Sequence, residues 1–397
     1  MKAIIRRITI ANFINLFMFL YVLSIYILTY RVGLNTISNA LALILIVLVW
    51  VNVVLSRKSI VFNKILLTFL IFILICLCST FFAISQNATI EKSKTLFLIF
   101  LVMITLVNYT DSYEKLKKFI TYFIYSGLLT SIYILLTSDF SEVTRFGGEL
   151  GNVNSIGLNI GLSSIFCFYI IISEKKYWYS TFFIVMIPCI LLTGSRKALI
   201  FVIFNMILIL YLQNRRSLKK ILKFSIITIL VLTFFYYMIF NIPFFYEIIG
   251  DRMENLLAFA TGKGSNEGSI NIRYNMTIIG LELFKSRPFT GYGIDNYRYL
   301  YAGTYSHNNF IELMVGTGIV GVIFYYLTQI ILIKDLSRIS RYISEYKIIC
   351  YIFIAIAISY IILSPSIVYY YDKHINFVFA IGSSIVGFSK NTVNGST

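Results

Sequence analysis

The sequence has little charge, few prolines and almost no histidine. Charged residues make up 13% of its 397 residues, and there are 4 prolines and 2 histidines. A soluble globular chain is about 25% charged and at most about 50% apolar. Here hydrophobic residues reach 58%, so the composition excludes an ordinary soluble domain.

Several chemical signatures are also missing. The sequence has no P-loop or GxGxxG motif, no Asp-x-Asp pair to bridge a nucleotide-sugar diphosphate through a divalent ion, and no His, Asp or Glu cluster with metal-ligand spacing. The cysteines form no CxxC pair, and each lies in an apolar run, which excludes a disulfide framework. We therefore expect neither a cofactor nor a metal.

Long apolar runs are what the sequence does contain. Because about 20 apolar residues cross a bilayer core as a helix, we predict twelve spans. No run alternates like a barrel strand, so the predicted fold is an all-α polytopic membrane protein. The fourth, seventh and last spans are short or polar-tipped, which leaves eleven or ten open. The predicted spans are 9–29, 37–55, 65–84, 95–110, 119–137, 154–173, 177–193, 198–213, 221–241, 309–333, 348–364 and 368–388.

The net charge of +17 follows the same topology. Lysine and arginine are concentrated in alternate short loops, for example 57–64, 115–118 and 215–223, and such loops stay in the cytoplasm. Both termini are then cytoplasmic. Topology and anionic membrane lipid account for the basic balance, so we do not expect nucleic acid as a partner.

The predicted organisation is one transmembrane domain, residues 1–397, with a large external loop at 242–306 between spans nine and ten. We expect a short helix over 247–260, a flexible break over 262–268, and a second helix whose apolar stripe ends at Pro288. The stripe comprises Ile272, Met276, Ile279 and Leu283. A loop of this length with its own helices is typical of a folded functional cap.

The break between spans seven and eight is a candidate anion site. Gly194 permits a sharp turn, Ser195 can cap the next helix, and Arg196 opens that helix. A guanidinium fork at a helix N-terminus suits a phosphate. The alternative is an arginine that extends from the end of a span to the interface.

A second candidate precedes span ten. His307 lies where a polar loop meets the span, and a neutral imidazole there can accept a proton at neutral pH. Its alternative role is a polar interface residue. Glu312, about one turn into the span, either pairs with an arginine or caps the helix. Arg273 opens the amphipathic stripe of the loop, where it is either functional or a solvated helix-face charge.

Four short segments together resemble the O-antigen polymerase (Wzy) and O-antigen ligase (WaaL) superfamily of bacterial envelope enzymes, over most of the chain. They are Gly-Asn-Val-Asn-Ser-Ile-Gly at 151–157, Thr-Gly-Ser-Arg at 193–196, Arg273 with Pro-Phe-Thr-Gly-Tyr-Gly at 288–293, and His-Asn-Asn-Phe-Ile-Glu at 307–312 with Gly318 and Gly321. A valine replaces the proline usual in the first motif. The acidic residue that often follows the glutamate of the last motif is also absent.

The resemblance implies a metal-independent glycosyltransferase of the GT-C type in the bacterial plasma membrane, with its active site on the external face. Its donor is a glycan on undecaprenyl diphosphate, with Arg196 and Arg273 holding the diphosphate and His307 beside the acceptor, as base or as phosphate ligand. These three are the predicted catalytic residues. The predicted substrate-binding residues are Arg145, Glu149, Asn152, Asn154, Arg287, Asn308 and Glu312.

The resemblance favours a polymerase of O-antigen, capsule or exopolysaccharide that passes the chain to a lipid-linked repeat unit. Expected partners are the lipid-linked oligosaccharide, membrane lipid, and a chain-length regulator and flippase of the same pathway. A ligase would use the same donor and pass the chain to a lipid A core. A polysaccharide flippase or other transporter is the alternative of another class, and it would need charged groups lining a path on both sides of the membrane.

Overall fold

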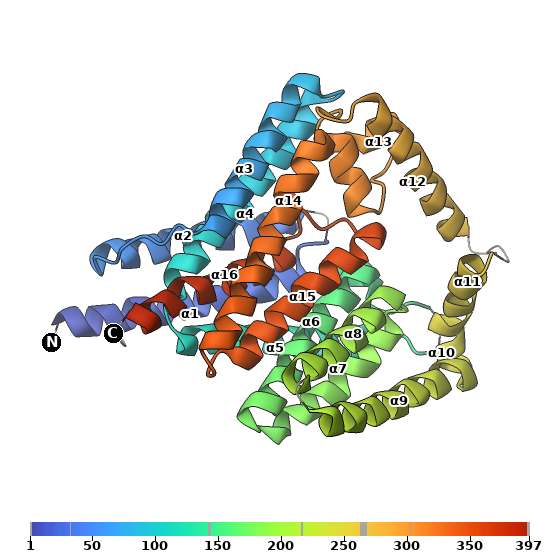
Figure 1. Ribbon diagram of the computed structural model, residues 1–397, viewed down its shortest axis with the longest axis horizontal. Coiled ribbons are helices and arrows are strands. Elements are labelled where there is room, and N and C mark those ends of the chain that lie inside the picture. Colours follow the sequence, from blue (N-terminus) through green and yellow to red (C-terminus); the bar gives the residue numbers. More distant parts are fainter. Residues whose placement is uncertain are drawn as a thin grey trace. The chain divides into compact units, whose positions relative to one another are not determined.

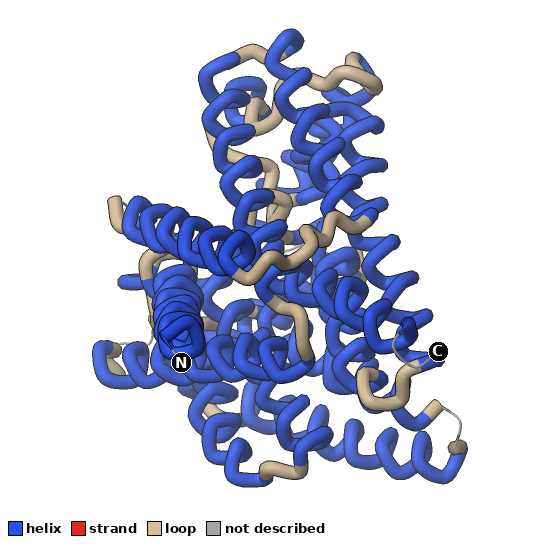
Figure 2. Tube along the Cα trace, turned by 90° about the vertical axis from the view of Figure 1, so that its left-hand side faces the viewer, coloured by secondary structure: helices blue, strands red, loops and turns tan. Residues whose placement is uncertain are grey.

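A computed structural model of the chain describes residues 2–31, 33–141, 144–215, 217–262, 268–301 and 303–394. This part of the chain consists of helices joined by turns and contains no strand (Figure 2). The predicted all-α polytopic membrane fold is thereby confirmed. The helices belong to two compact units, each assembled from three separate stretches of chain.

Nine helices within the described residues are long and apolar enough to cross a membrane. A helix satisfies its backbone hydrogen bonds within one segment, as hydrocarbon requires. They are Ile10–Ile27, Asn35–Leu55, Lys64–Phe82, Tyr113–Thr137, Val153–Glu174, Arg196–Asn214, Leu218–Asn241, Asn309–Tyr342 and Lys347–Ser366.

The three other predicted spans are the short or polar-tipped ones. The fourth lies within α4 (Gln86–Tyr109), whose first turns are polar and which starts earlier than the apolar run. The seventh is α7 (Ser180–Leu192), which has only 13 residues and contains Pro188. The last overlaps α16 (Lys373–Asn394). Their lengths and polar residues explain why only nine helices meet the requirements for a span.

The first unit contains residues 1–45, 117–266 and 343–359. Its helices include α1 (Lys2–Ile27), α5 (Tyr113–Thr137), α6 (Val153–Glu174), α8 (Arg196–Asn214), α9 (Leu218–Asn241) and α15 (Lys347–Leu363). Helix α6 packs against α7 and α8, and α8 packs against α9 (Figure 1). Nearly every residue in the middle of α6 is buried, so α6 forms the centre of this packing.

The second unit contains residues 46–116, 267–342 and 360–397. It is built on α3 (Lys64–Cys78), α4, α12 (Gly268–Ser286), α14 (Asn309–Tyr342) and α16, while α2 (Asn35–Leu55) contributes residues to both units. Helix α14 packs against α3, α12 and α16, and α16 packs against α4. Helix α14 is therefore the element on which the second unit is assembled.

The predicted external loop contains helices from both units. Residues 242–260 form the short α10 (Pro243–Phe245), a π-helical turn (Tyr246–Gly250) and α11 (Asp251–Ala260). Helix α12 and the short α13 (Tyr297–Leu300) follow. Both predicted helices are confirmed. Residues 263–267 of the predicted break lie outside the described residues.

One detail of the predicted stripe on α12 is wrong. Ile272 is 55% exposed, and the buried residues of this helix are Ile270, Met276 and Gly280. The buried face turns toward Gly280 because a Cβ there would lie only 2.2 Å from the side chain of Ile311. A close backbone approach between α12 and α14, which a hydrophobic pattern does not reveal, sets the orientation of the helix.

Helix α14 is kinked at Gly318, where the backbone has φ 65° and ψ −168°. The kink receives the loop after α12: the N–H of Ile319 donates to the Pro288 carbonyl at 2.8 Å, and the N–H of Tyr292 donates to the Val315 carbonyl at 2.7 Å. A Cβ at Gly318 would lie 2.4 Å from the carbonyl oxygen of Phe289. We call this contact between residues 287–293 and 315–319 the backbone joint.

Replacing Gly318 by alanine should strongly destabilise the second unit, because the new methyl group meets main-chain atoms and the residue also has positive φ. Positive φ alone costs about 1–2 kcal/mol for a non-glycine residue, and the clash adds to it. Thermal unfolding of the purified protein in detergent measures the effect. Gly303→Ala is the matched control, since Gly303 has φ +65° with nothing within 4 Å. Equal melting temperatures for the two variants would contradict the joint.

Candidate functional site

The turn between α7 and α8 has the geometry that the sequence predicts. Gly194 has φ 58°, and a Cβ there would lie 2.8 Å from the Ile248 carbonyl and 3.1 Å from Nε of Arg145. The hydroxyl of Ser195 accepts from the Ala198 N–H at 3.4 Å and caps α8. Only glycine fits this position, and Arg196 consequently becomes the first residue of α8.

Arg145 connects this turn to the start of α6. Its Nε donates to the Thr193 carbonyl at 2.8 Å, and its Nη2 donates to Oδ1 of Asn154 at 2.8 Å. Asn152 caps α6 by accepting from the Asn154 N–H at 3.0 Å. Two motifs about forty residues apart in the chain are thus joined by one half-buried guanidinium.

Arg196 lies half-buried beside α11, and its Nη1 donates to the carbonyl oxygen of Arg252. The N-terminus of α8, whose dipole favours an anion, therefore lies near the start of α11. We call Arg145, Arg196 and Arg252 the arginine cluster, to which Arg252 contributes the carbonyl oxygen that accepts from Arg196. Arg252 is absent from the predicted site, and its only sequence signal is a basic residue in the short helix predicted over 247–260.

Glu149 is directed elsewhere. The hydroxyl of Tyr133 donates to its carboxylate at 3.4 Å, and Nε of Arg31 donates to its backbone carbonyl at 3.1 Å. Its neighbour Gly151 has φ 110°, and a Cβ there would lie 2.5 Å from the Tyr30 carbonyl. The structure thus brings Arg145, Asn152, Asn154 and Arg196 together, while the Glu149 side chain contacts Tyr133 on α5.

His307 occupies a tight turn in the second unit. It has φ 58°, a left-handed conformation that costs energy for a non-glycine residue. The next residue, Asn308, caps α14 by accepting from the N–H groups of Phe310 at 3.0 Å and Ile311 at 3.2 Å. The imidazole lies against the ring of Tyr305, with centroids 4.2 Å apart. The cap by Asn308 holds the backbone of His307 in this left-handed conformation and thereby sets the position of the imidazole.

Glu312 is almost completely buried, with 4% of its surface exposed. The backbone amide and hydroxyl of Ser306, together with Asp295 and Lys92, act electrostatically on its carboxylate, and Oε2 has no hydrogen-bond partner among the described residues. The sequence predicts an arginine pair or a cap for Glu312. The interactions found are with Ser306, the residue before His307, and with Lys92 and Asp295, so Glu312 connects the strained turn to these two charges.

Lys92, from α4, brings a cation to the same region. Its Nζ lies 3.4 Å from Oδ1 of Asp295 and 3.6 Å from the centroid of the Tyr371 ring. Burial lowers the pKa of Lys92, and the nearby carboxylates of Asp295 and Glu312 act in the opposite direction. Arg298 also pairs with Asp295. We call Lys92, Asp295, Arg298, His307 and Glu312 the histidine-turn cluster.

The predicted site omits Lys92 and Arg298. Lys92 stands in the polar first turns of α4, next to Glu91 and close to Lys94, and this concentration of charge before an apolar helix is its only sequence signal. Its approach to Asp295 joins residues about two hundred positions apart. Only tertiary packing brings such a pair together.

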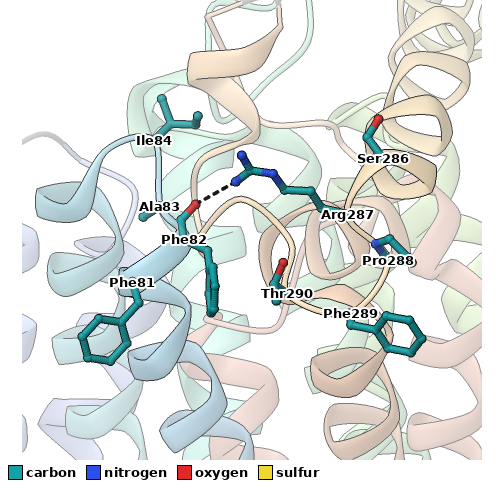
Figure 3. Close-up of a pocket in the computed structure, with 9 residues that line it drawn as sticks. All are labelled: Phe81, Phe82, Ala83, Ile84, Ser286, Arg287, Pro288, Phe289 and Thr290. Atoms are coloured by element: carbon teal, nitrogen blue, oxygen red, sulfur yellow. Dashed lines mark hydrogen bonds between the residues drawn. The ribbon is translucent and has the colours of Figure 1, made fainter.

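Arg273 and Arg287 lie at opposite ends of α12. Arg273 is half-buried near the start of the helix, and Thr277 donates its hydroxyl to the Arg273 carbonyl at 3.0 Å. Arg287 is exposed at the end, beside a hollow of about 560 Å³. Figure 3 shows its guanidinium directed at the Phe82 carbonyl, a bond of 3.4 Å, while the rings of Phe81 and Phe289 point away.

The guanidinium of Arg287 also stacks over the ring of Tyr292, with its carbon 4.5 Å from the ring centroid. This contact and the bond to Phe82 tie Arg287 to the backbone joint.

These features define a polytopic α-helical membrane protein with charged clusters fixed at the ends of its helices. Residues 181–326 carry a domain that matches the family model Wzy_C, described as O-Antigen ligase. This match confirms the resemblance to the O-antigen polymerase and ligase superfamily over that segment. No curated protein matches the chain. The matched segment includes Arg196, Arg252, the backbone joint and the His307 turn, whereas Lys92 and Arg145 precede it.

Arg145→Lys should loosen the turn between α7 and α8, because an ammonium cannot reproduce the fork that reaches both Thr193 and Asn154. A hydrogen bond from a charged group contributes about 1.5–3 kcal/mol. Hydrogen exchange of peptides covering 152–156 and 193–198 should therefore accelerate at least about tenfold. Arg31→Lys serves as the control, and exchange as slow as in the wild type would contradict the role of Arg145.

Glu312→Leu should release the His307 turn, whereas Glu312→Gln should retain it, since a glutamine side chain keeps a polar oxygen beside the Ser306 amide. Exchange of the Ser306 amide is the measurement, and we expect at least about tenfold faster exchange in the leucine variant alone. The idea fails if both variants exchange like the wild type, or if both lose protection equally.

Proposed function

We propose that the protein is a polysaccharide polymerase that transfers a glycan chain from undecaprenyl diphosphate to a lipid-linked repeat unit on the external membrane face. The observation that carries the proposal is the arginine cluster at the N-terminus of α8, within and beside the segment that matches the O-antigen ligase family. Guanidinium groups at a helix N-terminus suit a diphosphate better than any neutral ligand.

The reaction needs stabilisation of a leaving diphosphate. In the proposed step the acceptor hydroxyl attacks the anomeric carbon, the bond from that carbon to the phosphate oxygen breaks, and undecaprenyl diphosphate leaves with inversion at the anomeric centre. Arg196 and Arg273 hold the developing negative charge. Donors arranged in advance toward such charge contribute strongly to catalysis. The proposal assigns this charge stabilisation to the two arginines.

The proton of the acceptor hydroxyl goes to His307 in this proposal. Its fixed turn and stacking on Tyr305 support that role, because a general base must be held in a defined position. The amide and charged groups of Arg145, Glu149, Asn152, Asn154, Arg287, Asn308 and Glu312 would bind or position the substrates.

The proposed location is the bacterial plasma membrane, with both termini in the cytoplasm and both clusters on the external side. The alternation of basic loops in the sequence supports this orientation. A chain-length regulator and a flippase of the same pathway are the proposed protein partners, and capsule, exopolysaccharide or O-antigen is the proposed product.

A ligase is the second candidate, favoured by the description of the matching family as O-antigen ligase. It would use the same donor and the same arginine cluster, and pass the chain to a lipid A core. The two functions differ in acceptor alone, so the products distinguish them.

The test uses a strain whose only copy carries Arg196→Ala, Arg273→Ala or His307→Ala, at matched membrane abundance. We expect transfer to fall by at least about a hundredfold, since loss of one charge-stabilising donor has that effect. Arg341→Ala is the control, because Arg341 is an exposed arginine at the far end of α14.

The lipid-linked products distinguish a polymerase from a ligase. Single repeat units accumulating on the carrier would support the polymerase. Long chains that form on the carrier but never reach an envelope acceptor would support the ligase. Wild-type behaviour of all three variants would contradict both functions as proposed.

A further inference from the structure

A cavity of about 230 Å³ lies within the first unit, among α6, α7, α8 and α9. Its lining is apolar apart from Thr228, with Phe183 and Ile187 from α7, Met206 from α8 and Leu232 from α9. Three of the four helices qualify as membrane spans, and Figure 1 labels all four, coloured from green (α6) to olive-yellow (α9). The cavity therefore lies among apolar helices and has no charged residue in its lining.

The cavity shares a helix with the arginine cluster. Leu199, three residues after Arg196, lines it at one end and Leu210 lines it at the other. At a rise of about 1.5 Å per residue, the lined part of α8 is about 16 Å long. Leu199 also belongs to a buried cluster with Ile239 and Ile249, which lies next to the π-helical turn before α11. Helix α8 thus carries a guanidinium group at its start and borders an apolar cavity along its length.

This arrangement matches an amphiphile with a strongly anionic head and one long chain. A phospholipid phosphodiester carries a single negative charge, whereas a diphosphate carries more, and the head-group end holds the guanidinium groups of Arg145 and Arg196 and the N-terminus of α8. The complementarity of charge therefore favours a diphosphate lipid over the bulk phospholipids of the membrane.

We infer that the cavity between α8 and α9 binds the isoprenoid chain next to the diphosphate head of the donor lipid. The inference rests on the proposed function for the identity of the lipid, and it adds a site for the chain. Binding energy from the chain would anchor the donor while its head lies at the N-terminus of α8.

The experiment measures binding to the purified full-length protein in nanodiscs, with two probes that share a head group: undecaprenyl diphosphate and dimethylallyl diphosphate. Met206→Trp and Leu232→Trp fill the cavity from its two walls. Ile200→Trp is the matched control, because Ile200 is on α8 but 42% exposed and outside the lining. Arg196→Ala tests the head group.

The inference predicts that the cavity-filling variants affect one of the two probes and that Arg196→Ala affects both. Each buried methylene strengthens binding by roughly fourfold, so each cavity-filling variant should weaken undecaprenyl diphosphate binding at least about tenfold without a matching loss for dimethylallyl diphosphate. Arg196→Ala should weaken both probes. Ile200→Trp should bind both like the wild type.

Three results would overturn the inference: tight binding of undecaprenyl diphosphate by both cavity-filling variants, an equal loss in Ile200→Trp, or equally effective competition by phosphatidylglycerol. The proposed function fails separately. If the variants affect the two probes as predicted but the protein transfers no glycan from the bound lipid, the chain site remains and the assigned reaction is wrong.

Discussion

Hydrogen bonds from fixed arginine side chains to the main chain are the interaction on which the arginine cluster and the backbone joint depend. Arg145 donates to the Thr193 carbonyl, Arg196 to that of Arg252, and Arg287 to that of Phe82. In an apolar chain a charge is costly unless its partners are provided. A bond to a carbonyl oxygen fixes the plane of the guanidinium group, and the other N–H donors of the group can bind further partners. The positions of the charges are therefore determined by helix ends.

Glycine sets where those helix ends can lie. Gly194 lets α8 start against the π-helical turn, and Gly318 lets the loop after α12 press into the kink of α14. In both places a Cβ would meet main-chain atoms, which cannot move aside as a side chain can. The glycines of the motifs thus bring backbone segments together, and the charged residues beside them follow. Replacing either glycine by another small residue would not preserve these backbone contacts, because any Cβ would meet main-chain atoms.

Much of this fold could be predicted from hydropathy, since apolar runs of span length have few alternatives in a membrane. Turn chemistry also predicted the cap by Ser195 and the end of the stripe before Pro288. The orientation of α12 could not be predicted, because it depends on the approach of Gly280 to Ile311. For the same reason the predicted site omitted Lys92 and Arg252, whose partners are remote in the chain or lie on the main chain. The proposed roles of Arg196, Arg273 and His307 remain predictions.

The most direct test of the account is transfer by the purified protein with a defined lipid-linked donor and acceptor. The account predicts a lengthened glycan and one free undecaprenyl diphosphate for each transfer, in a reaction that Arg196→Ala slows by at least about a hundredfold. Folded wild-type protein that binds the donor but releases no undecaprenyl diphosphate, with either a repeat-unit or a lipid A core acceptor, would contradict it.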